Sequence, residues 1–219
     1  MATPPIFSYE VTTKDVEGLP DARGNSIKAM LASNYGIEVG TVRVILGYQV
    51  RAEMTNEDAQ RTVFDLFADP VIEEGCVNET LLDNKMIFPI APQIAITTGF
   101  KPGVTDNAAQ AGLDGLLTIF PSISERAEVA TSRSYLFWGV PKEISSEWLA
   151  SKLHNRMIER AIIADSIDCK AGNWPSLDFP DRPALQQQKP ATVNLEVSDE
   201  KLIEISQNGL LALNLGEMQ

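Results

Sequence analysis

An internal repeat is the feature that most constrains the fold of this chain. Two segments of roughly 70 residues each follow the order strand, turn, helix, long strand, helix, short strand. Matching positions keep a nearly constant spacing, because Asp21 and Asp106 lie 85 residues apart whereas Ile72 and Ile158 lie 86 apart. The repeat predicts a duplicated α+β unit whose two copies are related by approximate two-fold symmetry and bury matching faces against each other.

The first copy is assigned to residues 1–82. Its opening strand is predicted from apolar residues that alternate with polar ones at Phe7, Tyr9 and Val11. Its remaining elements are a turn at 21–24, a helix that Gly36 ends, a long strand over 42–54, a helix with a capping box at 55–58, and a last strand that starts at 70–74. Gly47 interrupts the long strand, which predicts a bend or bulge there.

The second copy is assigned to residues 90–165 and repeats this order. The predicted elements are a strand over 93–100, a turn over 101–106, a helix carrying Ala109 to Leu117, a long strand over 127–140, a helix capped by Ser145 or Ser146, and a last strand that begins at 155–159.

Composition changes after the second copy, so residues 166–197 are predicted to form an extended linker. The segment contains Pro175, Pro180, Pro183, Pro190 and the run Gln186–Gln188. Its apolar residues are Trp174, Leu177 and Phe179. They indicate a strap that lies on a protein surface, and they argue against free disorder.

Residues 198–219 are predicted to begin a further region. Ser198 is a good helix N-cap and Asn208–Gly209 ends that short helix. A second capping box at Asn214–Glu217 then announces a helix that has barely begun at Gln219. We therefore expect the chain to be cut or split from a longer polypeptide.

Charge and composition exclude several classes of protein. The chain has 30 acidic and 18 basic residues, a net charge of −12, and no basic block, so nucleic acid is not expected as a partner. No run reaches the ~18 apolar residues of a membrane span, and the first twenty residues lack a secretory signal. A cytoplasmic protein without a membrane partner is expected, and two cysteines in 219 residues fit a reducing compartment.

The sequence offers few groups for catalysis. It has no phosphate-binding glycine loop, no CxxC pair and no HExxH motif. The single histidine, His154, stands at a predicted helix end, where capping the last carbonyls is the favoured interpretation. Cys76 and Cys169 have no neighbouring histidine to activate them. We therefore predict no catalytic residue, no metal site and no cofactor on this chain.

Two clusters leave alternatives open. The carboxylates Asp65, Asp69, Glu73 and Glu74 could form an acid/base pair or a magnesium site, although a solvated acidic face is favoured. In the loop 101–107, Gly103 permits a positive φ and the following helix start could hold an anion, although a turn capped by Asp106 is favoured.

These residues resemble a known family. The stretches Asp21–Gly24 and Phe67–Glu73 are similar to PurS, the small subunit of phosphoribosylformylglycinamidine synthase. The second copy, with Gly99–Asn107, resembles the second PurS-like half of single-chain synthases (PurL). The end of the chain, 198–218, resembles the start of that enzyme's linker region. The sequence departs from the family at Asn107–Gln110 and at Asn155–Met157.

The resemblance implies both a fold and a role. The fold would be duplicated PurS-like β-α-β-α-β units, related to the ferredoxin-like fold, in a pseudo-dimer with antiparallel sheets. The chain would be a non-catalytic part of an ATP-dependent C–N ligase that converts formylglycinamide ribonucleotide to formylglycinamidine ribonucleotide. It would bridge the synthase part, which carries ATP and magnesium, and a glutaminase (PurQ-like) part.

No catalytic residue matches the family, so the candidate residues are structural or interfacial. They are Asp21, Gly24, Asp69, Pro70, Glu73, Gly103, Thr105 and Asp106. Two other functions remain open. One is a tandem ferredoxin-like domain that senses a small molecule, which would need a ligand pocket and a closed C-terminus. The other is an independent small enzyme, which the missing histidines and nucleotide loops disfavour.

Overall fold

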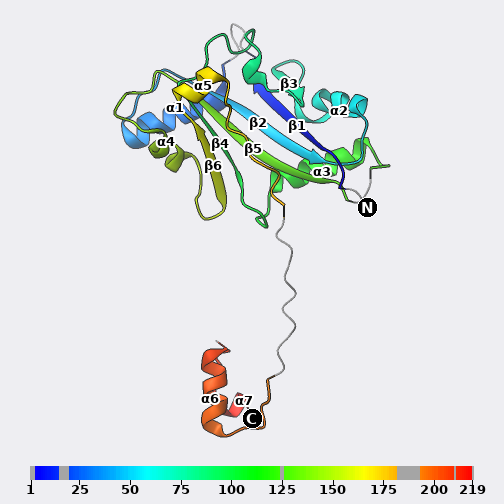
Figure 1. Cartoon of the computed structure of the whole chain (residues 1–219), viewed down its shortest axis with the longest axis vertical. Helices are drawn as coiled ribbons and strands as arrows, with labels where there is room; N and C mark the ends of the chain where they lie inside the picture. The colour runs from blue at the N-terminus through cyan, green and yellow to red at the C-terminus, as the bar shows by residue number, and fades with distance from the viewer. Residues whose placement is uncertain (1–2, 15–19, 124–125, 182–192, 210, 219) are drawn as a thin grey trace. The chain divides into compact units, whose positions relative to one another are not determined.

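One six-stranded antiparallel sheet forms the centre of the first of two compact units (Figure 1). The computed structural model describes residues 3–14, 20–123, 126–181, 193–209 and 211–218. Residues 1–183 form one compact unit and 184–219 a second. In chain order the elements of the first unit are β1 (Ile6–Thr13), α1 (Ala22–Tyr35), β2 (Thr41–Arg51), α2 (Asn56–Thr62), η1 (Val63–Phe67), β3 (Glu73–Val77), η2 (Leu81–Asp83), β4 (Ile94–Phe100), α3 (Asn107–Ile119), β5 (Glu128–Trp138), α4 (Ser146–Leu153), β6 (Glu159–Ala164) and α5 (Ser166–Ala171).

The strand order is β3-β1-β2-β5-β4-β6. From either edge inward, the strands are the last, the first and the second strand of one predicted copy. Each copy contributes three strands, with its first strand between the other two. The long strands β2 and β5 join the copies, pairing from Thr41 with Trp138 to Arg51 with Glu128. The α+β class is therefore confirmed. The two copies do not bury sheet faces against each other, however; they join edge to edge in one sheet.

Helices α1 to α4 cover one face of this sheet, and helices of the two copies pack on each other at both ends of it. Tyr35 at the end of α1 meets Trp148 of α4 edge-on, with ring centroids 5.3 Å apart. At the other end of the sheet, α3 packs on η1, where Gly112 and Gly115 lie against Phe67 and Leu66. The helix layer therefore depends on both copies at once.

The second face is covered by the segments that follow the last strand of each copy. Leu81, Leu82 and Phe88 pack on Ile45 and Leu136, the residues of β2 and β5 that point away from the helices. Figure 1 shows the chain after α5 running along the sheet.

The strap expected around Trp174, Leu177 and Phe179 lies on this second face. Thr97 donates to the carbonyl of Pro175, and Gln49 donates to that of Leu177, each at 2.8 Å. The predicted linker was wrong for Ser166–Ala171, which form α5; Asp165 caps this helix by accepting from Ile167 and Asp168. Pro183, Pro190 and Gln186–Gln188 lie outside the described residues.

Local signals placed most helix starts correctly. Asp21, Thr55, Asp106 and Ser145 are N-caps whose side chains accept from the backbone three residues on. The bulge predicted at Gly47 was wrong, because β2 keeps its register with both neighbours through that residue. Gly47 instead leaves room for the Ser132 side chain on the neighbouring strand, since a Cβ at position 47 would lie 2.2 Å from the hydroxyl oxygen of Ser132.

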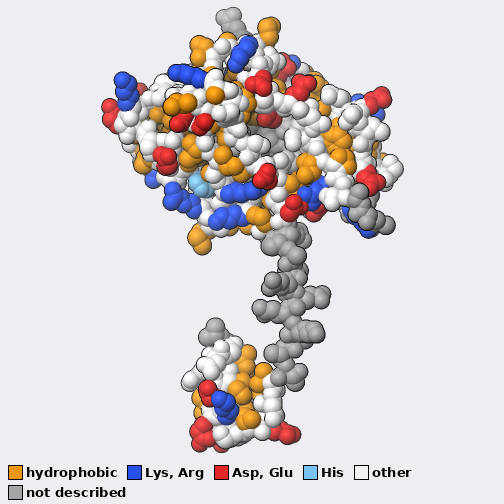
Figure 2. Space-filling view, viewed as in Figure 1, with side chains coloured by type: hydrophobic (Ala, Val, Ile, Leu, Met, Phe, Trp, Pro, Cys, Tyr) orange, Lys and Arg blue, Asp and Glu red, His pale blue; other side chains and the backbone are white. Residues whose placement is uncertain are grey.

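The second unit contains α6 (Asp199–Asn208) and α7 (Leu215–Met218). The predicted second capping box is confirmed, because Asn214 N–H donates to Glu217 and Glu217 N–H donates to the Asn214 side chain. Apolar side chains lie together on the face of this unit that Figure 2 shows. The large exposed ones are Val193, Leu195, Val197, Ile203, Leu211 and Leu213. Within the described part of the chain, no helix is both long and apolar enough to cross a membrane.

Candidate functional site

The candidate residues of the first copy meet where β1 ends and α1 begins. Asp21 caps α1 through Gly24 N–H and also accepts from Arg43 Nε at 3.1 Å. Arg43 in turn donates to the carbonyl of Thr13 at 2.5 Å. Gly24 is required here, because a Cβ would lie 2.0 Å from the carbonyl oxygen of Val42. The Asp21–Arg43 pair therefore fixes how α1 sits on the sheet.

Residues 69–73 form a turn, called here the first corner turn, that leads into β3. Asp69 accepts from Val71 N–H with its side chain and donates its own N–H to Glu73 Oε2 at 2.9 Å. The other oxygen of Glu73 pairs with Arg23 at 2.7 Å. Lys14 Nζ donates to the carbonyl of Pro70. The strand expected to start at 70–74 therefore begins at Glu73, because Asp69 first closes a turn.

Residues 155–159 form a second corner turn with the same contacts. Asn155 accepts from Met157 N–H with its side chain and donates its own N–H to Glu159. Lys101 Nζ donates to the carbonyl of Arg156, as Lys14 does to Pro70. The last strand of this copy therefore also begins later than predicted, at Glu159.

Both corner turns expose apolar side chains at their tips. Val71 and Ile72 are 77% and 42% exposed, and Met157 and Ile158 are 83% and 40% exposed. Each tip thus presents two neighbouring exposed apolar side chains, at equivalent places in the two copies. The candidates Asp69, Pro70 and Glu73 thus support one such tip.

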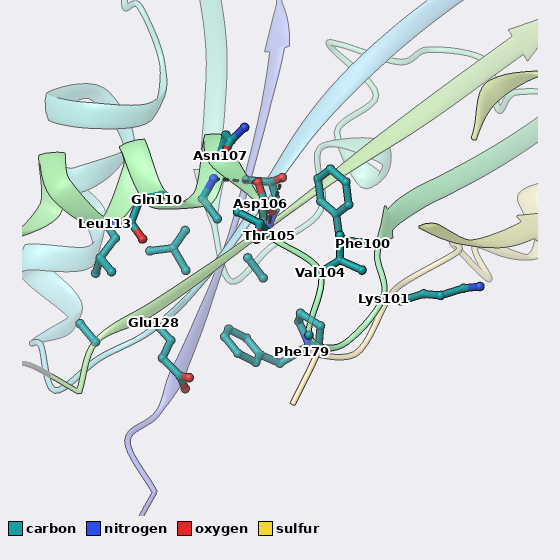
Figure 3. A pocket seen from close by; sticks show the side chains of 17 residues that line it. Phe100, Lys101, Val104, Thr105, Asp106, Asn107, Gln110, Leu113, Glu128 and Phe179 are labelled. Carbon is teal, nitrogen blue, oxygen red and sulfur yellow. Dashed lines mark hydrogen bonds between the residues drawn. The ribbon is translucent and has the colours of Figure 1, made fainter. Parts of the chain in front are cut away.

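The remaining candidates, Gly103, Thr105 and Asp106, lie beside a hollow of about 420 Å³ (Figure 3). Gly103 has a φ of +84°, as expected for the turn. The carboxylate of Asp106 accepts from Ala109 N–H and from both the N–H and the hydroxyl of Thr131. It therefore occupies the helix start where an anion would bind, which favours the turn over the anion site. Lys101 points away from the hollow.

The acidic cluster does not assemble into one site. Glu73 pairs with Arg23 and Asp65 pairs with Arg61, 3.3 Å apart. Among the residues that the structure describes, no group of three potential ligands could hold a metal ion. These pairings favour a structural role for the cluster over an acid/base pair.

The histidine and cysteines occupy structural positions. His154 Nδ1 bonds the carbonyl of Ala150 at 2.5 Å, as expected at the end of α4. Burial raises the pKa of the Cys76 thiol to about 12, and the charge of Glu10 adds to that shift. Burial likewise raises the pKa of Cys169 to about 11. Neither thiol is ionised at neutral pH, so neither is a ready nucleophile.

The cations that organise both copies were not predicted from the sequence. Arg43 secures Asp21, Arg23 secures Glu73, and Lys14 and Lys101 hold the corner turns. A signal for the two lysines was present, since they lie 87 residues apart, close to the repeat spacing.

No protein-family model matches the chain, and no curated protein matches it.

Proposed function

We propose that the chain is the PurS-like scaffold region of phosphoribosylformylglycinamidine synthase. In this role it supports the ATP- and glutamine-dependent conversion of formylglycinamide ribonucleotide to formylglycinamidine ribonucleotide in the cytoplasm. ATP and magnesium would bind the associated synthase part. We also propose that its two β-α-β-α-β halves, which together resemble a PurS dimer, arose by duplication.

The observation that carries this proposal is the pair of equivalent corner turns. Both have the same Asx turn, the same carboxylate contact and the same lysine clamp, and both expose two apolar side chains. They lead into the last strand of each copy, and these strands, β3 and β6, form the two opposite edges of the sheet. Two separated and similar contact points suit a scaffold that bridges a synthase part and a glutaminase part.

Reconstitution tests the proposal. The chain is added to a synthase that lacks its N-terminal region, together with the glutaminase, and product formation from glutamine is compared with formation from ammonium chloride. We expect the chain to restore the glutamine-dependent reaction and to show no ATPase or glutaminase turnover by itself. Turnover by the isolated chain, or no restoration with soluble partners, would contradict the proposal.

Variants at the corner turns locate the contact. Val71→Asp combined with Met157→Asp is expected to reduce the restored activity at least tenfold, because each places a charge in an apolar contact. Both side chains are exposed, so the melting temperature should stay within about 2 °C. Met86→Asp is the matched control, since Met86 is 93% exposed and belongs to neither turn. Equal effects of the control and the double variant would remove the corner turns from the interface.

A further inference from the structure

A cavity of about 670 Å³ lies on the second face of the sheet, away from α1–α4. Its floor is formed by β1, β2, β4 and β5, through Ser8, Glu10, Gln49, Thr97, Ser132 and Ser134. Its walls are the segments 78–83 and 172–177. The indole N–H of Trp174 donates to Asp83 at 2.9 Å and ties the two walls together. The volume is that of a small-molecule site.

The floor offers hydrogen-bond acceptors that the fold does not fully use. Glu10 Oε2 accepts from Leu81 N–H at 2.8 Å and from the Thr80 hydroxyl at 3.1 Å. Within the described residues, Glu10 Oε1 receives no hydrogen bond. Gln49 donates its amide N–H to the strap, which leaves its amide oxygen available. The cavity is thus better supplied with acceptors than with donors.

The charged groups that line the cavity all have one sign. Glu10, Glu79 and Asp83 are acidic, and no lysine, arginine or histidine lines the described cavity. Carboxylates by themselves would form an ordinary solvated patch. Here the partly buried Glu10 and the exposed Glu79 and Asp83 line a partly open volume that also contains unused acceptors on the sheet, together with the apolar side chains of Ile45, Leu82 and Leu177.

We propose that this cavity binds a small organic cation, namely a short aliphatic primary amine. The ammonium group would donate to Glu10 Oε1, the Gln49 amide oxygen and the Ser132 hydroxyl, and the alkyl chain would lie along Leu82 and Leu177. Charge-assisted hydrogen bonds of this kind are about twice as strong as neutral ones. An anion of the same size would find no cation to pair with. This inference is independent of the scaffold function.

Titration of the isotope-labelled full chain by NMR tests the proposal. The probe is 1,4-diaminobutane at pH 8 and constant ionic strength, compared with 1,4-butanediol and with succinate. We expect the diamine to shift the amide signals of Glu10, Thr80 and Ser132, whereas the diol and succinate leave them unchanged. An equal response to the diol, no response to the diamine, or shifts spread evenly over acidic surface residues would overturn the proposal.

Variants distinguish diamine binding in the cavity from nonspecific attraction of the diamine to an acidic protein. Glu10→Gln keeps an acceptor for Leu81 but removes the charge, and it should weaken diamine binding about tenfold or more. Glu143→Gln is the matched control, because Glu143 is exposed and outside the cavity. The affinity of this variant for the diamine should stay within twofold of that of the native chain. Equal weakening in both variants would overturn the site. If Glu10→Gln fails to fold, Ser132→Ala, which removes another proposed acceptor, should also weaken diamine binding, and an unchanged affinity would overturn the site.

Discussion

Gly24 shows how one residue can fix the position of a helix. The first turn of α1 lies so close to β2 that a Cβ at this position would stand 2.0 Å from a backbone oxygen of Val42. Gly24→Ala should therefore destabilise the chain by about 3 kcal/mol, since neither backbone can move without disturbing the sheet. Gly112→Ala in α3 is the control, because its Cβ meets only ordinary contacts at 3.4 Å and beyond. It should be neutral or stabilise by up to about 1 kcal/mol in urea unfolding. Equal losses would contradict the packing argument.

Gly103 tests a different property, its backbone conformation. Its φ is +84° and nothing lies within 4 Å of a Cβ built there, so a side chain would meet strain but no clash. Gly103→Val should destabilise the chain by about 1–3 kcal/mol in urea unfolding. Gly103→Asn should cost less, because asparagine adopts positive φ more readily. A valine variant as stable as the native chain would show that the loop can relax.

Glu10 gives stability a pH dependence of predictable sign. Burial raises its pKa in the folded chain, and the charge of Asp83 adds to this although hydrogen bonds from Leu81 and Thr80 oppose it. The folded state therefore binds this proton more tightly than the unfolded state, so the contribution of Glu10 to stability falls as pH rises through the raised pKa. Glu10→Gln should raise the melting temperature at pH 8 and give little gain at pH 4. Glu143→Gln should show no such difference between the two pH values. A lower melting temperature for Glu10→Gln at pH 8 would mean that the hydrogen bonds outweigh burial.

At the scale of elements, strands and helix starts were predictable but several boundaries were not. Alternation at Phe7, Tyr9 and Val11 identified β1 because that strand has one face against the helices. The same rule began β3 and β6 too early, since Asp69 and Asn155 first use their side chains to close turns. The helix α5 was missed because its six residues carry too little periodicity, although Asp165 caps it and Cys169 packs on the sheet.

The strap was predicted from three apolar residues, and its contribution to stability can be measured. Leu177 is 7% exposed and packs beside Gly99 on the second face of the sheet. Leu177→Ala should lower the free energy of unfolding by about 2 kcal/mol, at the low end for buried leucine. Ser176→Ala, at the neighbouring exposed position, should change it by less than about 0.5 kcal/mol. A leucine variant with native stability would show that the strap only rests on the sheet.

At the scale of the whole molecule, the repeat predicted two similar units but not how they combine. Residue spacing identifies equivalent positions, such as Asp21 and Asp106, yet it carries no information about which strands meet. The pairing of β2 with β5 is a contact between distant parts of the chain, and so is the packing of α1 on α4. The candidate site likewise depends on contacts that residue spacing does not reveal. The N-cap Asp21 was visible locally, whereas its partner Arg43 lies 22 residues away on the next strand.

Because helices of the two copies pack on each other at both ends of the sheet, neither half should be stable as a monomer. Separated fragments 1–89 and 90–183 would each expose the long edge of β2 or β5 and the helix surfaces that contact the other copy. We expect each fragment by itself to aggregate, to self-associate or to show broad NMR signals, and the two together to form a 1:1 complex with the signals of the intact unit. Sedimentation and heteronuclear NMR of the fragments, separately and mixed, measure this. A monomeric fragment with dispersed signals would show that a half holds its helices without the other copy. Failure of the mixture to form a 1:1 complex, with both fragments soluble, would instead show that the link between the copies is needed to bring β2 and β5 together.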